Sequence, residues 1–155
     1  MSMFPPVIKN LLIINTLMLI LTFIAKDFMY EKFSLFYIGS PYFTPYQFVT
    51  HMFMHGGFVH LFFNMYSLVI FGVVLEQIWG SKKFLFYYMV TGLGAAAIHS
   101  FVLYLDASSL ASAANAGNFA ASQNLVILMA TPTVGASGAV YGVLLAYGML
   151  FPNNV

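Results

Sequence analysis

Three polar side chains in this apolar sequence are of types that together carry out acyl transfer: His60, Asn64 and Ser137. His60 and Asn64 are four residues apart, so on a helix both side chains project from one face. A serine hydroxyl can attack a carbonyl carbon, and an imidazole and a carboxamide can stabilise the resulting oxyanion. The group still missing from such a site is a base for the serine. Small residues surround the serine, in the run Gly135-Ala136-Ser137-Gly138-Ala139-Val140-Tyr141-Gly142.

Ser137 stands at the start of an apolar stretch that ends by Phe151. We expect a helix there, which Pro152 closes because proline cannot continue a helix interior. A serine at a helix N-terminus lies near the positive end of the helix dipole, which favours developing negative charge. The first backbone N–H groups of a helix also lack an intrahelical partner, so they can act as oxyanion donors.

Apolar stretches of membrane-spanning length are the elements that must position these groups. A transmembrane helix needs about 20 mostly apolar residues. The sequence predicts four such helices, the last of them short, at residues 7–25, 58–79, 84–105 and 137–151. The second begins just before His60 and the fourth begins at Ser137.

Lysine placement indicates how these helices are oriented in the membrane. Lys9 flanks the start of the first helix, and Lys82 and Lys83 lie between the second and the third. All three fall on the same side if the four segments span, and we expect that side, with the N-terminus, to be cytoplasmic.

Two connecting segments, residues 26–47 and 106–134, then face outward. His60, Asn64 and Ser137 lie on the same outward side. The ends of the helices that carry His60, Asn64 and Ser137 meet at one depth near the outer surface. The 106–134 segment is rich in Ala, Ser and Asn and specifies little structure, although its apolar part, Leu125 to Ala130, is expected to dip back toward the membrane.

The composition is that of a one-domain membrane protein. Of the 155 residues, 61% are hydrophobic and 6% are charged, and the mean hydropathy is +0.89. Soluble domains carry about 25% charged residues, so lipid must cover most of this chain. The absence of cysteine excludes disulfides and cysteine-bound metals. Five scattered lysines, no arginine and a net charge of +1 provide no basic patch for nucleic acid.

Three motifs occur in an order and spacing that match one family. The run 51–64, HMFMHGGFVHLFFN, ends on His60 and Asn64; Gly-Ala-Ser-Gly at 135–138 is followed by Tyr141; and Gly-Ser-Lys-Lys-Phe at 80–84 links the second and third helices. These resemble the second-helix signature, the Gly-x-Ser-Gly motif and the tight helix connection of rhomboid-type intramembrane serine proteases. The resemblance covers essentially the whole chain.

The resemblance implies an all-α polytopic transmembrane bundle, with four helices present of a probable six. Residues 1–155 would be one rhomboid-like transmembrane domain, incomplete at its C-terminus. In it Ser137 would be the nucleophile, His60 and Asn64 would stabilise the oxyanion, and Tyr141 would pack against the catalytic imidazole. The motif glycines would be Gly135 and Gly138.

The general base is the main departure from the family pattern. In the family it is a histidine on the sixth helix, and this chain stops at Val155. None of the four histidines present matches that position, so the 155-residue chain alone is expected to be inactive. For His51 we expect a role as a cap or loop anchor, for His55 a structural hydrogen bond in the loop, and for His99 either close packing or an interhelical hydrogen bond.

The implied function of the complete protein is endoproteolysis of other membrane proteins, with transmembrane substrates and the lipid bilayer as partners. The expected location is a bacterial plasma membrane, and no metal, organic cofactor or nucleic acid is implied. An alternative is a non-catalytic relative that binds transmembrane clients, although a pure binder does not need Ser137, His60 and Asn64 together. A zinc site is disfavoured because the histidine spacing does not match His-Glu-x-x-His. The oligomeric state and the substrate stay open.

Overall fold

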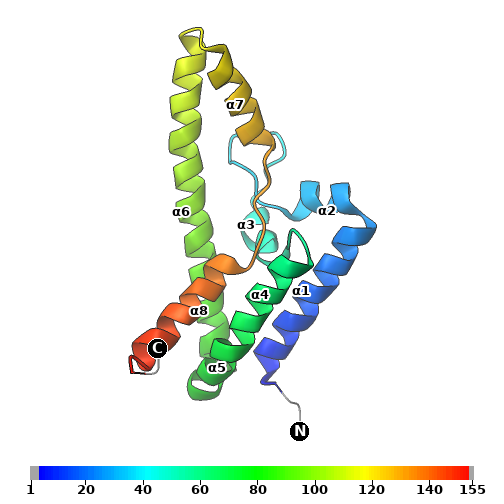
Figure 1. Ribbon diagram of the computed structural model, residues 1–155, viewed down its shortest axis with the longest axis vertical. Helices are drawn as coiled ribbons and strands as arrows, with labels where there is room; N and C mark the ends of the chain where they lie inside the picture. The colour runs from blue at the N-terminus through cyan, green and yellow to red at the C-terminus, as the bar shows by residue number, and fades with distance from the viewer. Residues whose placement is uncertain (1–3, 154–155) are drawn as a thin grey trace.

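A computed structural model covers residues 4–153, which fold almost entirely into helices (Figure 1). Apart from one β-bridge between Leu35 and Thr133, these residues contain no strand, so the predicted all-α class is confirmed. The elements in chain order are α1 (Pro6–Ile24), α2 (Lys26–Phe33), α3 (Gln47–Thr50), η1 (His51–Phe53), α4 (Phe58–Ser67), η2 (Leu68–Gly72), α5 (Val73–Trp79), α6 (Ser81–Asn115), α7 (Phe119–Ala130) and α8 (Ser137–Leu150).

Three helical stretches within the described residues are long and apolar enough to cross a bilayer, namely Pro6–Ile24, Phe58–Trp79 and Ser81–Asn115. The first two agree with the predicted bounds to within a residue. The second is formed by α4, η2 and α5 in succession, where η2 is a π-helical turn. The fourth, α8, has 14 residues and is shorter than a full span, as expected.

One buried carboxylate joins the ends of three helices. The backbone amides of Val7 and Ile8, in the first turn of α1, each donate to Glu76 of α5 at 2.9 Å. The Ser81 hydroxyl, at the start of α6, donates to the same carboxylate at 2.7 Å. Glu76 therefore satisfies amides that have no partner inside α1, and its negative charge lies at the positive end of that helix.

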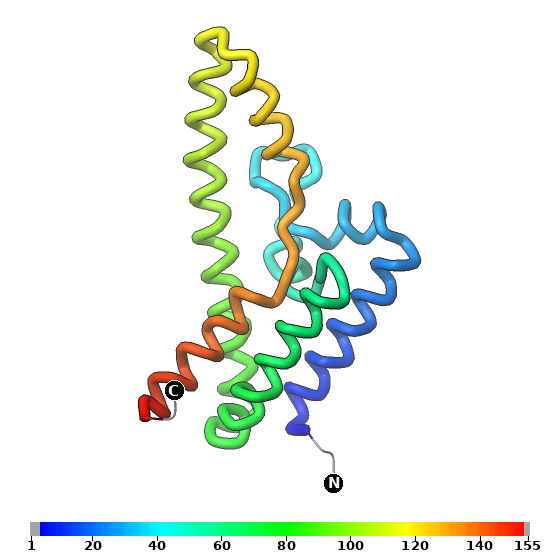
Figure 2. The backbone as a smooth tube through the Cα atoms, viewed as in Figure 1, coloured from blue at the N-terminus to red at the C-terminus, as the bar shows by residue number. Residues whose placement is uncertain are grey.

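The prediction that the third helix ends at Leu105 and that a linker follows was wrong. α6 continues to Asn115, and α7 then runs back along it (Figures 1 and 2). The segment is rich in alanine, the strongest helix former, and its first proline is Pro132. Gly117, at φ 90°, makes the turn between the helices, and the Asn118 side chain caps α7 by accepting from the Ala121 amide.

α8 packs closely on α6, and this contact places Ser137. A Cβ at Gly138 would lie 2.5 Å from the Cβ of Ala95, so only glycine allows the two helices to come this near. The Tyr87 hydroxyl on α6 donates to the Gly142 carbonyl on α8 at 2.9 Å. The core around this contact includes the fully buried side chains Leu68, Leu75, Phe84, Tyr88 and Val143.

Replacing Glu76 by alanine should lower the free energy of unfolding by about 2–3 kcal/mol, because buried amides and a hydroxyl lose their acceptor. Denaturation of the purified protein in detergent measures this change. The matched control is Gln77→Ala, which changes an exposed neighbour on the same helix. Equal stability of the two variants would contradict the role of Glu76 as the cap of α1.

The substitution Gly138→Val should destabilise the bundle by about 1–3 kcal/mol, because the new side chain overlaps Ala95 and forces α8 away from α6. Gly148→Val is the control, since a Cβ at Gly148 would meet no atom of a packed neighbour within 4 Å among the described residues. The same denaturation measurement compares them, and a Gly138 variant as stable as the control would show that the helices can separate at no cost.

Candidate active site

α4 carries two of the predicted site residues on one face. Its first turn begins at Phe58, and His60 and Asn64 follow one turn apart, as their spacing predicted. The Asn64 side-chain amide donates to the His60 carbonyl at 3.0 Å. This bond uses one of the two N–H donors of the carboxamide and fixes its direction, so the second donor stays available.

A backbone contact sets the tautomer of His60. The Gly56 amide donates to Nδ1 of His60 at 3.4 Å. Because a backbone N–H can only donate, Nδ1 must accept, so the proton of the neutral ring is on Nε2. The Nε2 side of the ring faces Gly135, where a Cβ would lie 3.0 Å from that nitrogen. His60 therefore presents an N–H group toward the segment that precedes Ser137.

That segment, residues 131–136, lies between α7 and α8 outside any helix and is held by backbone hydrogen bonds to two other parts of the chain. Thr133 and Leu35 exchange two hydrogen bonds, of 2.8 and 2.9 Å. The Gly135 amide donates to the His51 carbonyl at 2.9 Å. These bonds satisfy backbone groups that no helix covers and fix where α8 begins.

Gly135 is the point at which His60 and Ser137 come together. Its φ is 131°, a conformation that side chains rarely adopt. A Cβ there would lie 2.9 Å from Cε1 of His60 and 3.7 Å from Oγ of Ser137. The absence of a side chain at Gly135 thus leaves the space that separates the imidazole from the hydroxyl.

A pocket of about 430 Å³ contains all four predicted polar residues. Asn64 is buried at its wall, whereas Tyr141 is 72% exposed, so within the described residues it has room to pack against a further element. Ser67 also lines the pocket and was not predicted, although its position seven residues after His60 places it on the same helix face. The lining is His60, Phe63, Asn64, Ser67, Ser137, Val140, Tyr141 and Leu144.

The first turn of α8 offers backbone donors to this pocket. The first hydrogen bond inside the helix is donated by the Val140 amide to the Ala136 carbonyl at 3.0 Å. The amides of residues 137–139 precede it, and no side chain caps them. Near Ser137 the site therefore combines a hydroxyl, backbone amides at a helix N-terminus, an imidazole N–H and a carboxamide, which are suitable donors for an oxyanion.

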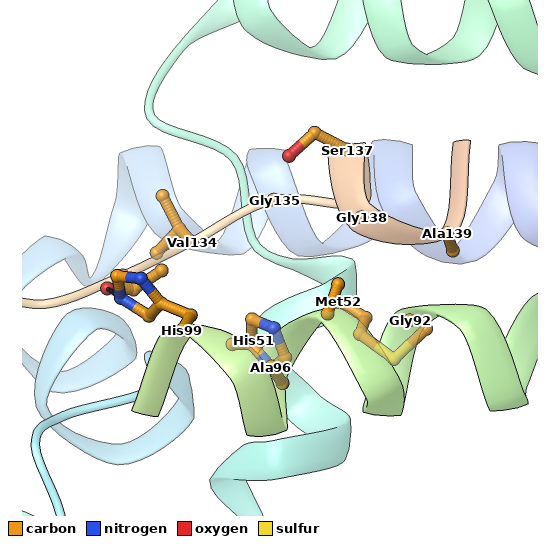
Figure 3. A pocket seen from close by; sticks show the side chains of 12 residues that line it. His51, Met52, Gly92, Ala96, His99, Val134, Gly135, Ser137, Gly138 and Ala139 are labelled. Atoms are coloured by element: carbon orange, nitrogen blue, oxygen red, sulfur yellow. Dashed lines mark hydrogen bonds between the residues drawn. The ribbon is translucent and has the colours of Figure 1, made fainter. Parts of the chain in front are cut away.

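A second pocket, of about 220 Å³, adjoins the first at Ser137 and contains His51 and His99 (Figure 3). Nδ1 of His51 lies 2.9 Å from the Gln47 carbonyl, and burial lowers the pKa of His51 although this bond opposes the shift. His99 lies 2.8 Å from the Thr133 hydroxyl. His51 anchors the loop, as expected, while His99 bonds to Thr133 in the segment of residues 131–136 rather than to another helix. No cluster of three possible metal ligands occurs among the described residues.

In place of the expected loop hydrogen bond of regular geometry, His55 has a contact of irregular geometry with the Phe53 backbone. Its ring is fully buried, and no hydrogen bond of regular geometry reaches either ring nitrogen within the described residues. Instead it packs edge to face on His60, with ring centroids 5.0 Å apart. Burial, and to a smaller extent the nearby His60, lowers the pKa of His55 to about 4. The ring that packs against His60 is therefore neutral at pH 7.

Comparison with curated proteins finds two relatives from Arabidopsis thaliana. "RHOMBOID-like protein 6, mitochondrial" is 35% identical over 69 residues, which are 44% of this chain and 22% of the relative. "RHOMBOID-like protein 2" is 38% identical over 63 residues, which are 41% of this chain and 20% of the relative. The chain thus spans about a fifth of the length of the curated relatives it matches. Both are plant proteins, so the expected bacterial plasma membrane finds no support in them.

The comparison with solved structures finds no match. The family model described as "Rhomboid domain" matches residues 42–155, which is most of the chain and includes both site motifs. Together with the apolar helices, this match identifies an integral membrane protein. The chain belongs to the rhomboid family.

Proposed function

We propose that this chain forms the nucleophile-bearing part of an intramembrane serine endopeptidase that cleaves transmembrane segments of other membrane proteins. The observation that carries the proposal is the shared pocket of His60, Asn64 and Ser137, in which a hydroxyl at a helix N-terminus lies among N–H donors. Membership of the rhomboid family supports it.

In this proposal the Ser137 oxygen attacks the scissile carbonyl carbon and its proton passes to a histidine base. The carbonyl oxygen becomes an oxyanion, which the N–H groups of His60 and Asn64 and the first amides of α8 stabilise. The amine leaves with the proton from the base, and an acyl-enzyme remains. A water molecule then gives a proton to the base and attacks the ester, which releases the acid and restores the serine.

The base is assigned to a histidine outside these residues, as the resemblance implies. Among the described residues, no histidine nitrogen makes a hydrogen bond with the Ser137 hydroxyl, and the exposed Tyr141 ring leaves room for another ring to pack there. The cytoplasmic location of the N-terminus remains a prediction from lysine placement.

A second candidate function is the binding of transmembrane clients without cleavage. It is favoured by the lack of a hydrogen-bonded base at Ser137 in this part of the chain. In that case the same pocket donates hydrogen bonds to a client's backbone, and the serine hydroxyl is one donor among several.

The test uses the full-length gene product in lipid vesicles, with a fluorescently tagged single-pass membrane protein as substrate. We expect cleavage, and a decrease of about 10³-fold or more in its rate with Ser137→Ala, because the nucleophile is lost. His60→Ala should lower the rate by about 10²–10³-fold, since one oxyanion donor is removed. The 155-residue chain alone should not cleave.

The matched control is Ser67→Ala, which removes a hydroxyl from the same pocket without removing the nucleophile. It should leave the rate within about twofold of the wild type. Cleavage that survives Ser137→Ala would disprove the peptidase proposal. Retention of the substrate without cleavage, equal in wild type and Ser137→Ala, would favour the client-binding function instead.

A further inference from the structure

The hairpin formed by the end of α6 and by α7, residues 106–130, has no role in the proposed chemistry. It extends beyond the ends of α1 and α4 on the side of the site (Figures 1 and 2). α6 has 35 residues, or about 52 Å of helix, whereas the hydrocarbon core of a bilayer is about 30 Å thick and the whole bilayer about 40–45 Å. A tilted α6 that begins at one surface therefore ends within or just beyond the opposite headgroup layer.

The hairpin carries large apolar side chains on its outer surface. Phe119 and Val126, seven residues apart on one face of α7, are 74% and 66% exposed. A groove of about 420 Å³ between the two helices is lined by three apolar residues, Leu110, Ile127 and Leu128, and by Asp106, Ser109 and Asn124. The α6 span also exposes large apolar side chains, which include Ile98, Phe101, Val102 and Leu105. The hairpin and the α6 span therefore both expose apolar side chains.

Charge distribution separates this hairpin from the other segment on the same side. α2 carries four charged residues in eight. Of the residues that follow it, Ser40 donates to the Met129 carbonyl at the end of α7, and Leu35 pairs with Thr133 just after the hairpin. The base of the hairpin thus lies beside the segment that follows α2, and its tip extends beyond α2 (Figure 1). Yet Asp106 is the last charged residue of the sequence, and residues 107–155 contain none. A helical pair that stands in water would be expected to carry charges on its exposed faces.

The polar groups of the hairpin are arranged as a headgroup layer requires. Three hydroxyls, two in α6 and one just after α7, donate to the carbonyl four residues earlier, so they need no water as a partner. These bonds run from Ser108 to Tyr104, from Ser112 to Ser108 and from Thr131 to Ile127, at 2.7 to 2.9 Å. The amide side chains gather toward the tip, whereas residues 125–130, nearest the bundle, are apolar. The amides are Asn115, Asn118, Gln123 and Asn124.

We propose that the hairpin of residues 106–130 is embedded in the phospholipid leaflet on the Ser137 side, with residues 125–130 at the boundary of the acyl chains and the amide-rich tip among the headgroups. Phe119 and Val126 form its lipid-contacting face. Because α7 leads directly into residues 131–136, lipid contact at α7 would help to hold the segment that positions Ser137. The proposal concerns membrane contact alone and does not depend on the proposed peptidase activity.

The test uses single cysteines, which are unique because the chain has none. The protein variants Val126→Cys and Phe119→Cys are reconstituted in phospholipid nanodiscs, in which both membrane faces are open to water. The references are Asp27→Cys on charged α2 and Val102→Cys in the α6 span. A charged maleimide should react with the two hairpin cysteines at least about tenfold more slowly than with Asp27→Cys, and an attached fluorophore should be quenched by nitroxide-labelled phospholipids, as at Val102→Cys.

Reaction at the rate of Asp27→Cys would show that the hairpin stands in water and would overturn the proposal. Slow reaction without quenching by lipid nitroxides would also overturn it, because a protein surface, such as a second copy of the chain, would then cover this face. Agreement between two cysteines seven residues apart excludes a local effect of one substitution.

Discussion

The hydrogen bond from the Gly135 amide to the His51 carbonyl is the constraint on which the candidate site depends. It joins the segment before α8, which carries Ser137, to the segment before α4, which carries His60 and Asn64. A non-helical backbone near a bilayer is tolerated only where the protein satisfies its polar groups. The same bond that meets this requirement therefore also sets the separation of the imidazole and the hydroxyl.

The opposite end of the bundle is fixed by electrostatics rather than by small residues. Glu76 accepts from two α1 amides and from Ser81, so α1, α5 and α6 meet at one carboxylate. At the site end, by contrast, Gly138 lets α8 approach Ala95 of α6. The bundle is thus held by a buried charge at one end and by close backbone packing at the other, and the pocket opens where packing leaves room at Gly135.

Side-chain patterns predicted the parts of this structure that depend on neighbours in sequence. The apolar stretches predicted the spans, and the i, i+4 spacing predicted that His60 and Asn64 share a helix face. Hydropathy indicates which part of a helix is covered by lipid, but not the residue at which the helix ends. The extension of α6 to Asn115 was therefore missed. The Gly135–His51 bond could not be predicted either, because it joins backbone groups 84 positions apart that every residue possesses.

The tautomer of His60 bears on how proton transfer can occur in such a site. Because Nδ1 accepts from the Gly56 amide, the neutral ring carries its proton on Nε2, the nitrogen that faces Gly135. A ring in this state donates to an oxyanion but has no free lone pair there to take the serine proton. In the proposed peptidase His60 would therefore stabilise negative charge, and a separate group would remove the proton from Ser137.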